Sequence, residues 1–260
     1  MDWTTLSCRA DGPVLRVTLR RPDRQNAVDA TLIAELGKAL DLAEQDGACR
    51  LVVLDAEGTT FCAGMDMREA ALGPAADTLG DPAAALGGAA FFALLRRFTT
   101  TPRVLVATVD GRVSGGGVGL VAACDFVHTT GRSGFGLPEL LWGLLPCSVL
   151  PFLVRRTGHQ RAAAMTLSTL PLTAQQAIAC GLADELSDEA GQFVRRLAGR
   201  LARLDGTVIG DAKRYLGGLA PIGEQQGERA VAEFARLMSR PEVRSGIEEF
   251  ARSGRYPWER

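Results

Sequence analysis

The architecture of this chain is indicated most strongly by Val113-Ser114-Gly115-Gly116-Gly117-Val118-Gly119-Leu120. This stretch follows a strand-like apolar run over residues 104–109 and leads into an apolar helical segment. Because glycine has no Cβ, the main chain can approach a substrate oxygen at the start of that helix, where unpaired N–H groups and the helix dipole favour negative charge. The stretch therefore predicts half of an oxyanion hole. A tight packing turn between a strand and a helix would use the same glycines and remains the alternative.

A second segment supplies the other half of the predicted oxyanion hole. Phe61-Cys62-Ala63-Gly64-Met65-Asp66 follows a strand-like run over residues 51–55 and precedes a polar helix start. We expect it to aim the N–H of Met65 at the same point as the N–H of Gly116. Two converging backbone donors are what the negatively charged oxygen of a thioester enolate requires.

Both segments and their spacing resemble the enoyl-CoA hydratase/isomerase (crotonase) family. Two further motifs carry the same resemblance, Arg21-Pro22-Asp23-Arg24-Gln25-Asn26-Ala27 and Leu137-Pro138-Glu139, and it covers almost the whole chain. The resemblance implies an α/β crotonase fold, a spiral of repeated ββα units with a C-terminal all-α region. It also implies that Met65 and Gly116 hold a thioester oxygen. The residues expected to bind substrate around these donors are Gly64, Asp66, Gly115, Gly117, Arg24, Leu137 and Trp142.

The pattern of apolar residues along the chain agrees with an α/β fold. Alternation from Leu15 to Leu19 predicts a half-buried strand, and Asp29 is expected to be the N-cap of the helix that follows. From Glu189 onward the pattern is helical only. We therefore divide the chain into a spiral core over residues 1–188 and a C-terminal helical region over residues 189–260. Further strands are predicted over residues 51–55, 104–109 and 126–129.

Composition limits the classes of function. A chain of 260 residues with 47% hydrophobic content can bury a sizeable core, and a net charge of −1 gives no bulk electrostatic reason to expect nucleic acid. Six cysteines form no CxxC pair, and metal-ligand spacing is absent, so we expect reduced thiols, no metal and no cofactor beyond the thioester carrier of the substrate. Without a leader-like start or an apolar run that could span a bilayer, we expect a cytoplasmic protein with no membrane association.

Glu139 is the expected acid–base group. It lies in Phe135-Gly136-Leu137-Pro138-Glu139-Leu140-Leu141, an apolar turn from loop to helix where burial should raise the pKa of a carboxylate. From the residues alone, a carboxylate that complements the dipole of a helix N-terminus is the alternative. The family resemblance favours catalysis, because Glu139 falls where crotonase hydratases carry one of their two catalytic glutamates.

The chain departs from the family at the other glutamate. Simple enoyl-CoA hydratases carry it two residues after the glycine triplet, and this position is Gly119 here. A mechanism that pins water between two carboxylates is therefore disfavoured. One carboxylate can still remove the proton α to a thioester and deliver it to a β-hydroxyl that leaves on the same face.

The remaining polar candidates have structural interpretations. We expect Asp66 to cap the next helix, Asp110 to lie in a turn, and His128 and His159 to be structural. The cations considered for a substrate carboxylate, a phosphopantetheine phosphate or an acidic carrier-protein helix are Arg24, Arg96 and Arg97. Residues 70–90, almost all small or apolar, are either an exposed connection or a lid that orders when an acyl chain binds.

A closer resemblance runs from Gly134 to Leu186. Residues 139–146 and 149–156, with Gly119 in place of the glutamate, are similar to crotonase-like dehydratases of polyketide β-branching cassettes. This implies dehydration of 3-hydroxy-3-methylglutaryl-acyl carrier protein to 3-methylglutaconyl-acyl carrier protein, by a homotrimer or a dimer of trimers. Two alternatives stay open. One is an ordinary hydratase or isomerase acting on a CoA thioester, and the other is a non-catalytic acyl-thioester binding or scaffold protein, against which Glu139 argues.

Overall fold

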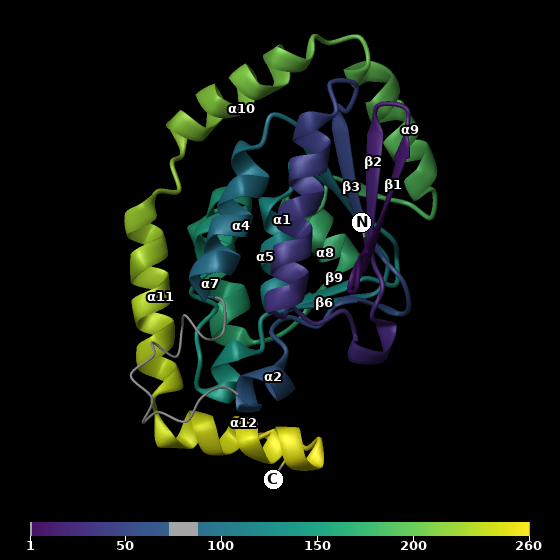
Figure 1. Ribbon diagram of the computed structural model, residues 1–260. Helices are drawn as coiled ribbons and strands as arrows, with labels where there is room; N and C mark the ends of the chain where they lie inside the picture. The colour runs from purple at the N-terminus through teal and green to yellow at the C-terminus, as the bar shows by residue number, and fades with distance from the viewer. Residues whose placement is uncertain (1, 73–87, 260) are drawn as a thin grey trace.

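Two β-sheets form the centre of the fold (Figure 1). The computed structural model describes residues 2–72 and 88–259. The larger sheet has the strand order β1 (Leu6–Asp11), β2 (Val14–Leu19), β3 (Leu51–Ala56), β5 (Val104–Val109), β7 (Phe126–Thr129) and β10 (Glu185–Leu186). The smaller sheet has the order β4 (Thr60–Cys62), β6 (Arg112–Ser114), β8 (Gly134–Gly136) and β9 (Leu172–Thr173). The strands expected within the larger sheet are confirmed, with shifts of one residue at some ends.

The chain builds the two sheets together, one strand at a time. Strands β3, β5 and β7 of the larger sheet are each followed by a short strand of the smaller sheet, β4, β6 and β8 respectively. Each short strand then leads toward a helix: α2 (Met67–Leu72), α5 (Gly116–Ala123), or the 3-10 helix η2 (Glu139–Trp142) with α6 (Leu150–Thr157). This is the expected spiral of ββα units. It places β4, β6 and β8 side by side and parallel, so that their carboxyl ends meet at one edge.

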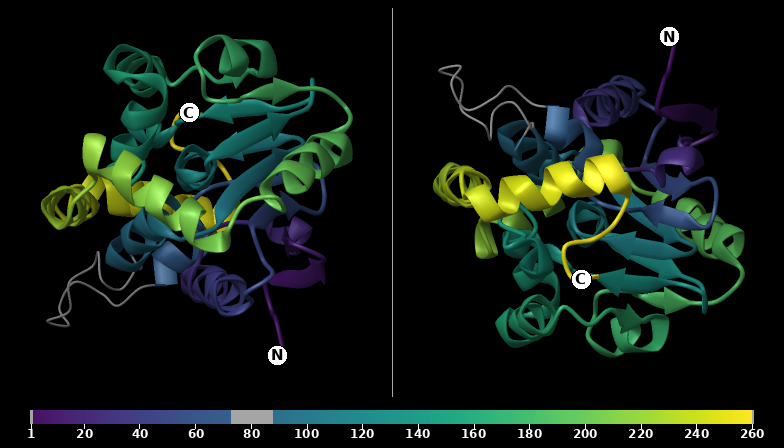
Figure 2. Two further views of the ribbon diagram at one scale, coloured as in Figure 1. Left: turned by 90° about the horizontal axis from the view of Figure 1, so that it is seen from above. Right: turned by 90° about the horizontal axis from the view of Figure 1, so that it is seen from below.

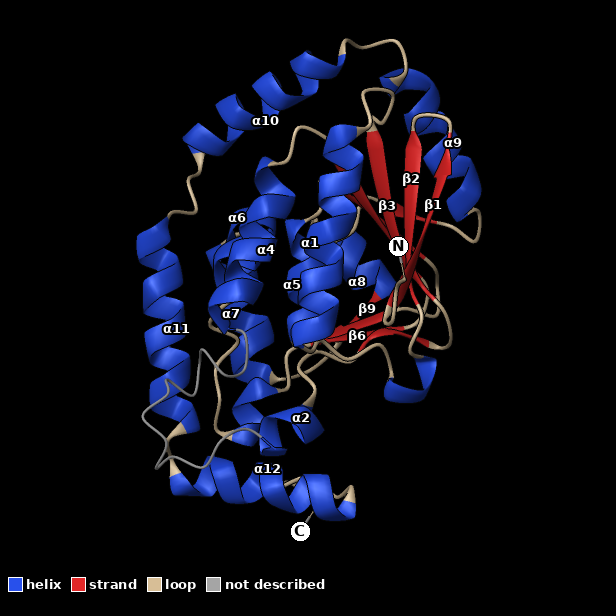
Figure 3. Ribbon diagram, in the orientation of Figure 1, coloured by secondary structure: helices blue, strands red, loops and turns tan. Residues whose placement is uncertain are grey.

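Helices cover both faces of the larger sheet (Figure 3). Every residue of β5 is buried, as expected for a parallel strand with two covered faces. On one face α9 (Ala190–Leu201) packs Phe193 and Val194 against the sheet, and on the other face lies α1 (Ala30–Gln45). Asp29 caps α1 by accepting a hydrogen bond from the N–H of Leu32, as expected. The other helices of the core are α4 (Gly88–Thr100), α7 (His159–Ser168) and α8 (Ala174–Ala179).

Three C-terminal helices extend around the core. They are α10 (Gly206–Leu219), α11 (Glu224–Met238) and α12 (Pro241–Ser253), and Figure 2 shows α12 crossing the lower side before the chain turns back. Helix α12 packs against α2. All residues after β10 that form regular structure are helical within the described range, whereas α9 shares apolar packing with the larger sheet. Side-chain packing thus crosses the proposed division at residue 188, which stays a prediction.

None of the described helices is long and apolar enough to cross a membrane.

Helix α10, at the upper left of Figure 1, is joined to the core by a buried lysine. The Nζ of Lys213 lies 2.6 Å from Oδ2 of Asp125 and donates to the carbonyls of Phe98 and Arg103, each at 3.0 Å. All three ammonium hydrogens therefore have protein acceptors, and burial lowers the pKa of Lys213.

Replacing this lysine should destabilise the fold. We expect Lys213→Met to cost about 3 kcal/mol of unfolding free energy, because it leaves Asp125 without its buried cation. The measurement is urea unfolding followed by circular dichroism. Arg214→Met on the same helix is the control, since its ion pair with Asp211 is exposed and should contribute under about 1 kcal/mol. Equal losses from the two substitutions would contradict this interpretation.

Candidate active site

The candidate site lies where the carboxyl ends of three parallel strands meet. Cys62, Val113 and Phe135 are in register across β4, β6 and β8. The chain therefore delivers the loops after these strands, which contain Met65, Gly116 and Glu139, to a common edge. The N–H of Gly115 donates to the carbonyl of Gly136 at 2.9 Å and ties two of the loops together. The three segments singled out from sequence are thus brought to one place.

Gly64 and the Gly115–Gly116 turn touch through their backbones. Gly64 has φ +87°, and a Cβ there would lie 2.8 Å from the carbonyl oxygen of Ser114 and 3.1 Å from the nitrogen of Gly116. Gly115 also has positive φ, +52°, at the N-cap of α5. Glycine is therefore required at both positions by conformation and by space. No side chain stands between the two loops that carry the expected donors.

In the part of the chain that the structure describes, the backbone N–H groups of the two expected donors, Met65 and Gly116, are not used by neighbouring backbone groups. Met65 forms an isolated parallel bridge with Val28, in which Val28 N–H donates to Gly64 and Asp66 N–H donates to Val28. In this pattern the N–H of Met65 itself points to the side away from Val28. Gly116 begins α5, so its N–H has no intrahelical acceptor. Among the described backbone hydrogen bonds outside helices and strands, none uses either N–H.

The carboxyl group of Glu139 lies against the same turn. Its Oε1 would be 3.1 Å from a Cβ on Gly115, while Oε2 is buried and has no hydrogen-bond partner among the described residues. Burial raises the pKa of Glu139 to about 7, above the ordinary range of glutamate. Glu139 begins the short helix η2, whose geometry is 3-10. A desolvated carboxyl with one oxygen that lacks a partner among the described residues suits proton transfer near neutral pH better than helix capping.

The position of the absent second glutamate is filled with hydrocarbon. A Cβ on Gly119 would lie 3.0 Å from Cγ2 of Val149 and 3.1 Å from Cδ1 of Leu95. Gly119, Val149 and Leu95 are all buried. Even a Cβ on Gly119 would require the side chains of Val149 and Leu95 to shift, and a larger side chain would require more displacement in a closely packed region.

Phe91 is a neighbour of the site that sequence reasoning did not identify. Its Cζ would be 3.4 Å from a Cβ on Gly116, which places the ring beside one expected donor. Phe91 and Leu95 are four residues apart and share one face of α4. Gly116 and Gly119 are three residues apart and share one face of α5, and the two helices pack along these faces. Helical spacing identifies Phe91 only as a core residue, because its neighbour on α5 is far away in the sequence.

Other residues expected at the site have different surroundings. A Cβ on Gly117 would lie 2.8 Å from both Cβ and the carbonyl oxygen of Cys62, so this glycine permits close contact between α5 and β4. Leu137 is fully buried in the main core. Trp142 is buried among aromatic rings from the C-terminal segment. Substrate contacts by these three residues stay predictions.

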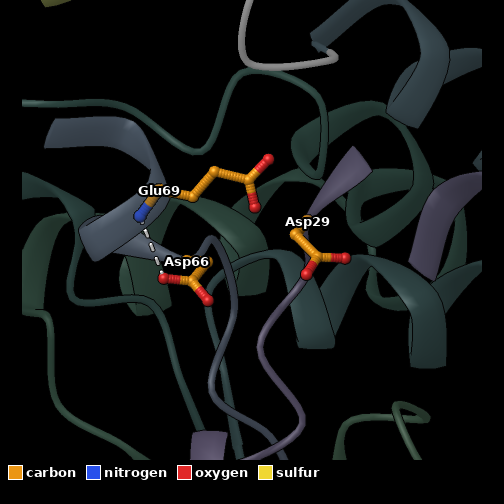
Figure 4. Close-up of side chains that lie close together, drawn as sticks. All are labelled: Asp29, Asp66 and Glu69. Carbon is orange, nitrogen blue, oxygen red and sulfur yellow. Dashed lines mark hydrogen bonds between the residues drawn. The ribbon is translucent and has the colours of Figure 1, made fainter. Parts of the chain in front are cut away.

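Three carboxylates gather next to the Met65 loop, as Figure 4 shows. Ligand atoms of Asp29, Asp66 and Glu69 lie within 4.8 Å of one another. Asp29 is paired with Arg21, and Asp66 with Arg24 at 2.7 Å. Asp66 also accepts hydrogen bonds from the N–H groups at the start of α2, including that of Glu69, in agreement with the expected cap. Capping and arginine pairing account for both aspartates without a bound cation.

The remaining candidates, apart from His159, are held by other protein groups. Asp110 accepts a hydrogen bond from Oγ1 of Thr130, and buried His128 places Nε2 2.9 Å from Oγ of Ser187. His159 is the first residue of α7. The pairs made by the two arginines of α4 are Arg96 with Glu224, and Arg97 with Asp41 and Glu44. Most of the lid expected over residues 70–90, namely 73–87, lies outside the described residues.

Comparisons with known proteins agree with this geometry. The family model described as enoyl-CoA hydratase/isomerase matches residues 9–260. The bacillaene synthase dehydratase PksH of Bacillus subtilis is 32% identical over 263 residues, which cover 100% of this chain and 98% of the relative. A mevalonyl-coenzyme A hydratase of Beauveria bassiana is 31% identical over 258 residues, covering 94% and 91%.

A solved structure shows the same fold. The crystal structure of a polyketide biosynthesis enoyl-CoA hydratase (pksH) from Bacillus subtilis superposes with a TM-score of 0.88 at 30% identity, and the match covers 98% of this chain and all of that one. Its fold extends over the spiral and the C-terminal helices alike. The family model, the sequence relatives and this structure agree. The chain belongs to the enoyl-CoA hydratase/isomerase (crotonase) family.

Proposed function

We propose that this protein is a dehydratase of acyl thioesters, and that its substrate is 3-hydroxy-3-methylglutaryl-acyl carrier protein, converted to 3-methylglutaconyl-acyl carrier protein. The observation that carries the proposal is the position of Glu139. A desolvated carboxyl lies against the Gly115–Gly116 turn, beside the backbone donors expected for a thioester oxygen. Similarity to a dehydratase over the whole chain supports the reaction class.

The first step is removal of a proton from C2 of the substrate. The N–H groups of Met65 and Gly116 hold the thioester carbonyl and stabilise the charge that develops on its oxygen. Removing one such donor costs about 10²–10³-fold in comparable oxyanion holes. Glu139, ionised, takes the C2 proton, and Phe91 and the buried α5 keep water away from the enolate.

The second step expels the hydroxyl from C3. The electron pair of the enolate forms the C2–C3 double bond as the C3–O bond breaks, and the proton held by Glu139 passes to the leaving oxygen to give water. One carboxylate thus acts first as base and then as acid. Hydrocarbon beside Gly119 is compatible with this sequence, because the reaction needs no second carboxylate to position an attacking water. Both steps use the N–H groups of Met65 and Gly116, the carboxyl group of Glu139 and the thioester substrate itself.

The substrate class is supported by a second relative. The mevalonyl group of the coenzyme A hydratase from Beauveria bassiana is a 3-hydroxy-3-methyl acyl group, the same pattern at C2 and C3 as in 3-hydroxy-3-methylglutaryl. The distal carboxylate of the proposed substrate needs a cation. Arg24 is the candidate nearest to the Met65 loop, since it pairs with Asp66 and keeps 42% of its side chain exposed.

We further propose that the protein works in the cytoplasm as a homotrimer or a dimer of trimers. The largely exposed apolar side chains of α10 support the assembly, because they repeat on one helical face: Val208, Tyr215, Leu216 and Leu219. The six free cysteines of the chain support the proposed cytoplasmic location, because thiols stay reduced in that compartment. Light scattering after size exclusion tests the assembly, and a monomer at micromolar concentration would contradict it.

Loss of water from the proposed substrate should depend on Glu139. We expect wild-type protein to reduce the mass of 3-hydroxy-3-methylglutaryl-acyl carrier protein by one water, and Glu139→Gln to fall by at least about 10²-fold because it has no base. Intact-protein mass spectrometry measures both. The CoA thioester of the same acyl group is the comparison that separates carrier-protein from CoA use. Equal activity of Glu139→Gln and wild type would remove Glu139 from the mechanism.

The rate should rise with pH around neutrality. Since burial raises the pKa of Glu139 to about 7 and the base must be ionised, kcat/KM should be low at pH 5.5 and level off above about pH 8. Initial rates in buffers of constant ionic strength measure this profile. A rate that is independent of pH between about 5.5 and 8.5 would show that the essential base titrates as an ordinary exposed glutamate.

Restoring a glutamate at position 119 should damage the fold and produce no hydratase. We expect Gly119→Glu to cost about 3 kcal/mol or more, because overpacking against Val149 and Leu95 and burial of a carboxylate outweigh the gain of under about 1 kcal/mol in helix propensity. Thermal and urea unfolding measure the change. Gly37→Glu on α1 is the matched control, since a Cβ there meets nothing within 4 Å. A stable Gly119→Glu protein that hydrates enoyl-CoA would refute the interpretation.

A further inference from the structure

Four aromatic rings meet at the far end of the helix that carries Glu139. They are Trp142, Phe250, Tyr256 and Trp258, and we call them the aromatic clasp. The centroid of the buried Trp142 ring lies 5.3 Å from Phe250, 5.9 Å from Tyr256 and 5.4 Å from Trp258, each in an edge-to-face arrangement. Tyr256 and Trp258 stack on each other at 4.7 Å. Distances and angles of this kind are those at which aromatic pairs attract.

The clasp is joined to Glu139 through one short turn. Glu139 and Trp142 are the first and last residues of η2. The carbonyl of Glu139 accepts a hydrogen bond from Leu144 N–H at 2.9 Å, so the backbone of the glutamate is held by residues just beyond the tryptophan. Gly143, which lies between Trp142 and Leu144, has φ +75°. A Cβ on Gly143 would lie 3.1 Å from Cγ2 of Val243 on α12. The C-terminal segment therefore packs against both the ring and the backbone of this turn.

Trp142, Phe250 and Tyr256 of the clasp belong to a larger apolar cluster that reaches the other side of the site. Trp142, Val243 and Ile247 are among its buried residues, and the side chains of Met65 and Met67 pack against it. Helix α12 also contacts α2, the helix that follows Met65. The C-terminal segment thus supports the loop of one expected donor and the turn of the expected base, although it is distant from both in the sequence.

We propose that Trp142 is a positioning residue for Glu139, and that Phe250, Tyr256 and Trp258 hold it in place, so that the C-terminal segment sets the orientation and desolvation of the catalytic carboxyl. The proposal rests on the proposed function in treating Glu139 as the base. It gives Trp142 a role through Glu139 in place of the substrate contact expected from the sequence. A 3-10 turn closed by few hydrogen bonds has little rigidity of its own, which is why support from outside matters here.

The test uses full-length variants of the clasp. Tyr256→Leu/Trp258→Leu removes two rings and leaves α12 in place, Trp142→Leu removes the central ring, and Trp142→Phe keeps a ring. Leu170→Ala is the control, because Leu170 is an exposed apolar residue outside both the clasp and α10. For each protein we would measure kcat, KM and the pH profile with 3-hydroxy-3-methylglutaryl-acyl carrier protein, thermal stability, and amide hydrogen exchange at residues 140–144.

We expect the two Leu variants of the clasp to lose at least about tenfold in kcat with KM changed less than about twofold, as for a displaced catalytic group. The midpoint of the pH profile should fall below that of the wild type, because a loosened turn admits water to the carboxyl. Amides of Gly143 and Leu144 should exchange faster. Trp142→Phe should retain most of the activity, and Leu170→Ala should match the wild type in all five measurements.

Unchanged kcat, pH midpoint and amide exchange in the clasp variants, with only a lower melting temperature, would overturn the proposal and leave the clasp a structural element. Failure of the proposed function has a different signature. If the wild type removes no water from the substrate, the exchange rates of Gly143 and Leu144 still decide whether the clasp holds the Glu139 turn. Faster exchange in the Leu variants of the clasp but not in Leu170→Ala would support it, and equal exchange would refute it.

Discussion

Direct contact between the backbone at Gly64 and the turn at Gly115 and Gly116 is the constraint on which the rest of the site depends. A Cβ on Gly64 would come within 2.8 Å of the Ser114 carbonyl, so the two loops can meet only as bare main chain. Parallel pairing of β4, β6 and β8 brings their carboxyl ends to that meeting point. The larger sheet and its helices hold this small sheet in place, which is how an ordinary α/β core comes to bring the two expected backbone donors and one carboxyl group together.

Exclusion of water from the site is the second physical constraint. Glu139 gains its raised pKa from burial, and its Oε2 has no partner among the described residues. Leu95 and Val149 close the space beside Gly119. A site with one desolvated carboxyl and two backbone donors is suited to forming an enolate and passing a single proton onward. It is poorly suited to holding a nucleophilic water between two carboxylates. The chemistry proposed for this chain follows from that asymmetry.

Sequence reasoning identified what depends on local pattern. Strands β2, β3, β5 and β7 of the larger sheet, the cap at Asp29 and the burial of Glu139 all leave a signal within a few neighbouring residues, whereas β1 and β10 were not predicted. Strands β4, β6 and β8 have three residues each, too few for an alternating pattern, so they were not predicted individually. The position of Phe91 and the rings around Trp142 result from contacts between distant segments. Gly117 belongs to the same motif as Gly116, yet only the structure shows that its neighbour is Cys62.

The most direct measurement is hydrogen–deuterium exchange at C2 of an acyl thioester that lacks the 3-hydroxyl, 3-methylglutaryl-acyl carrier protein, in deuterated water. This substrate can form the enolate but has no leaving group, so mass spectrometry reports proton removal alone. We expect wild-type protein to introduce deuterium at C2 and Glu139→Gln to introduce none above the rate without enzyme. Exchange that is undiminished in Glu139→Gln, or absent from the wild type, would contradict a site in which Met65 and Gly116 stabilise an enolate formed by Glu139.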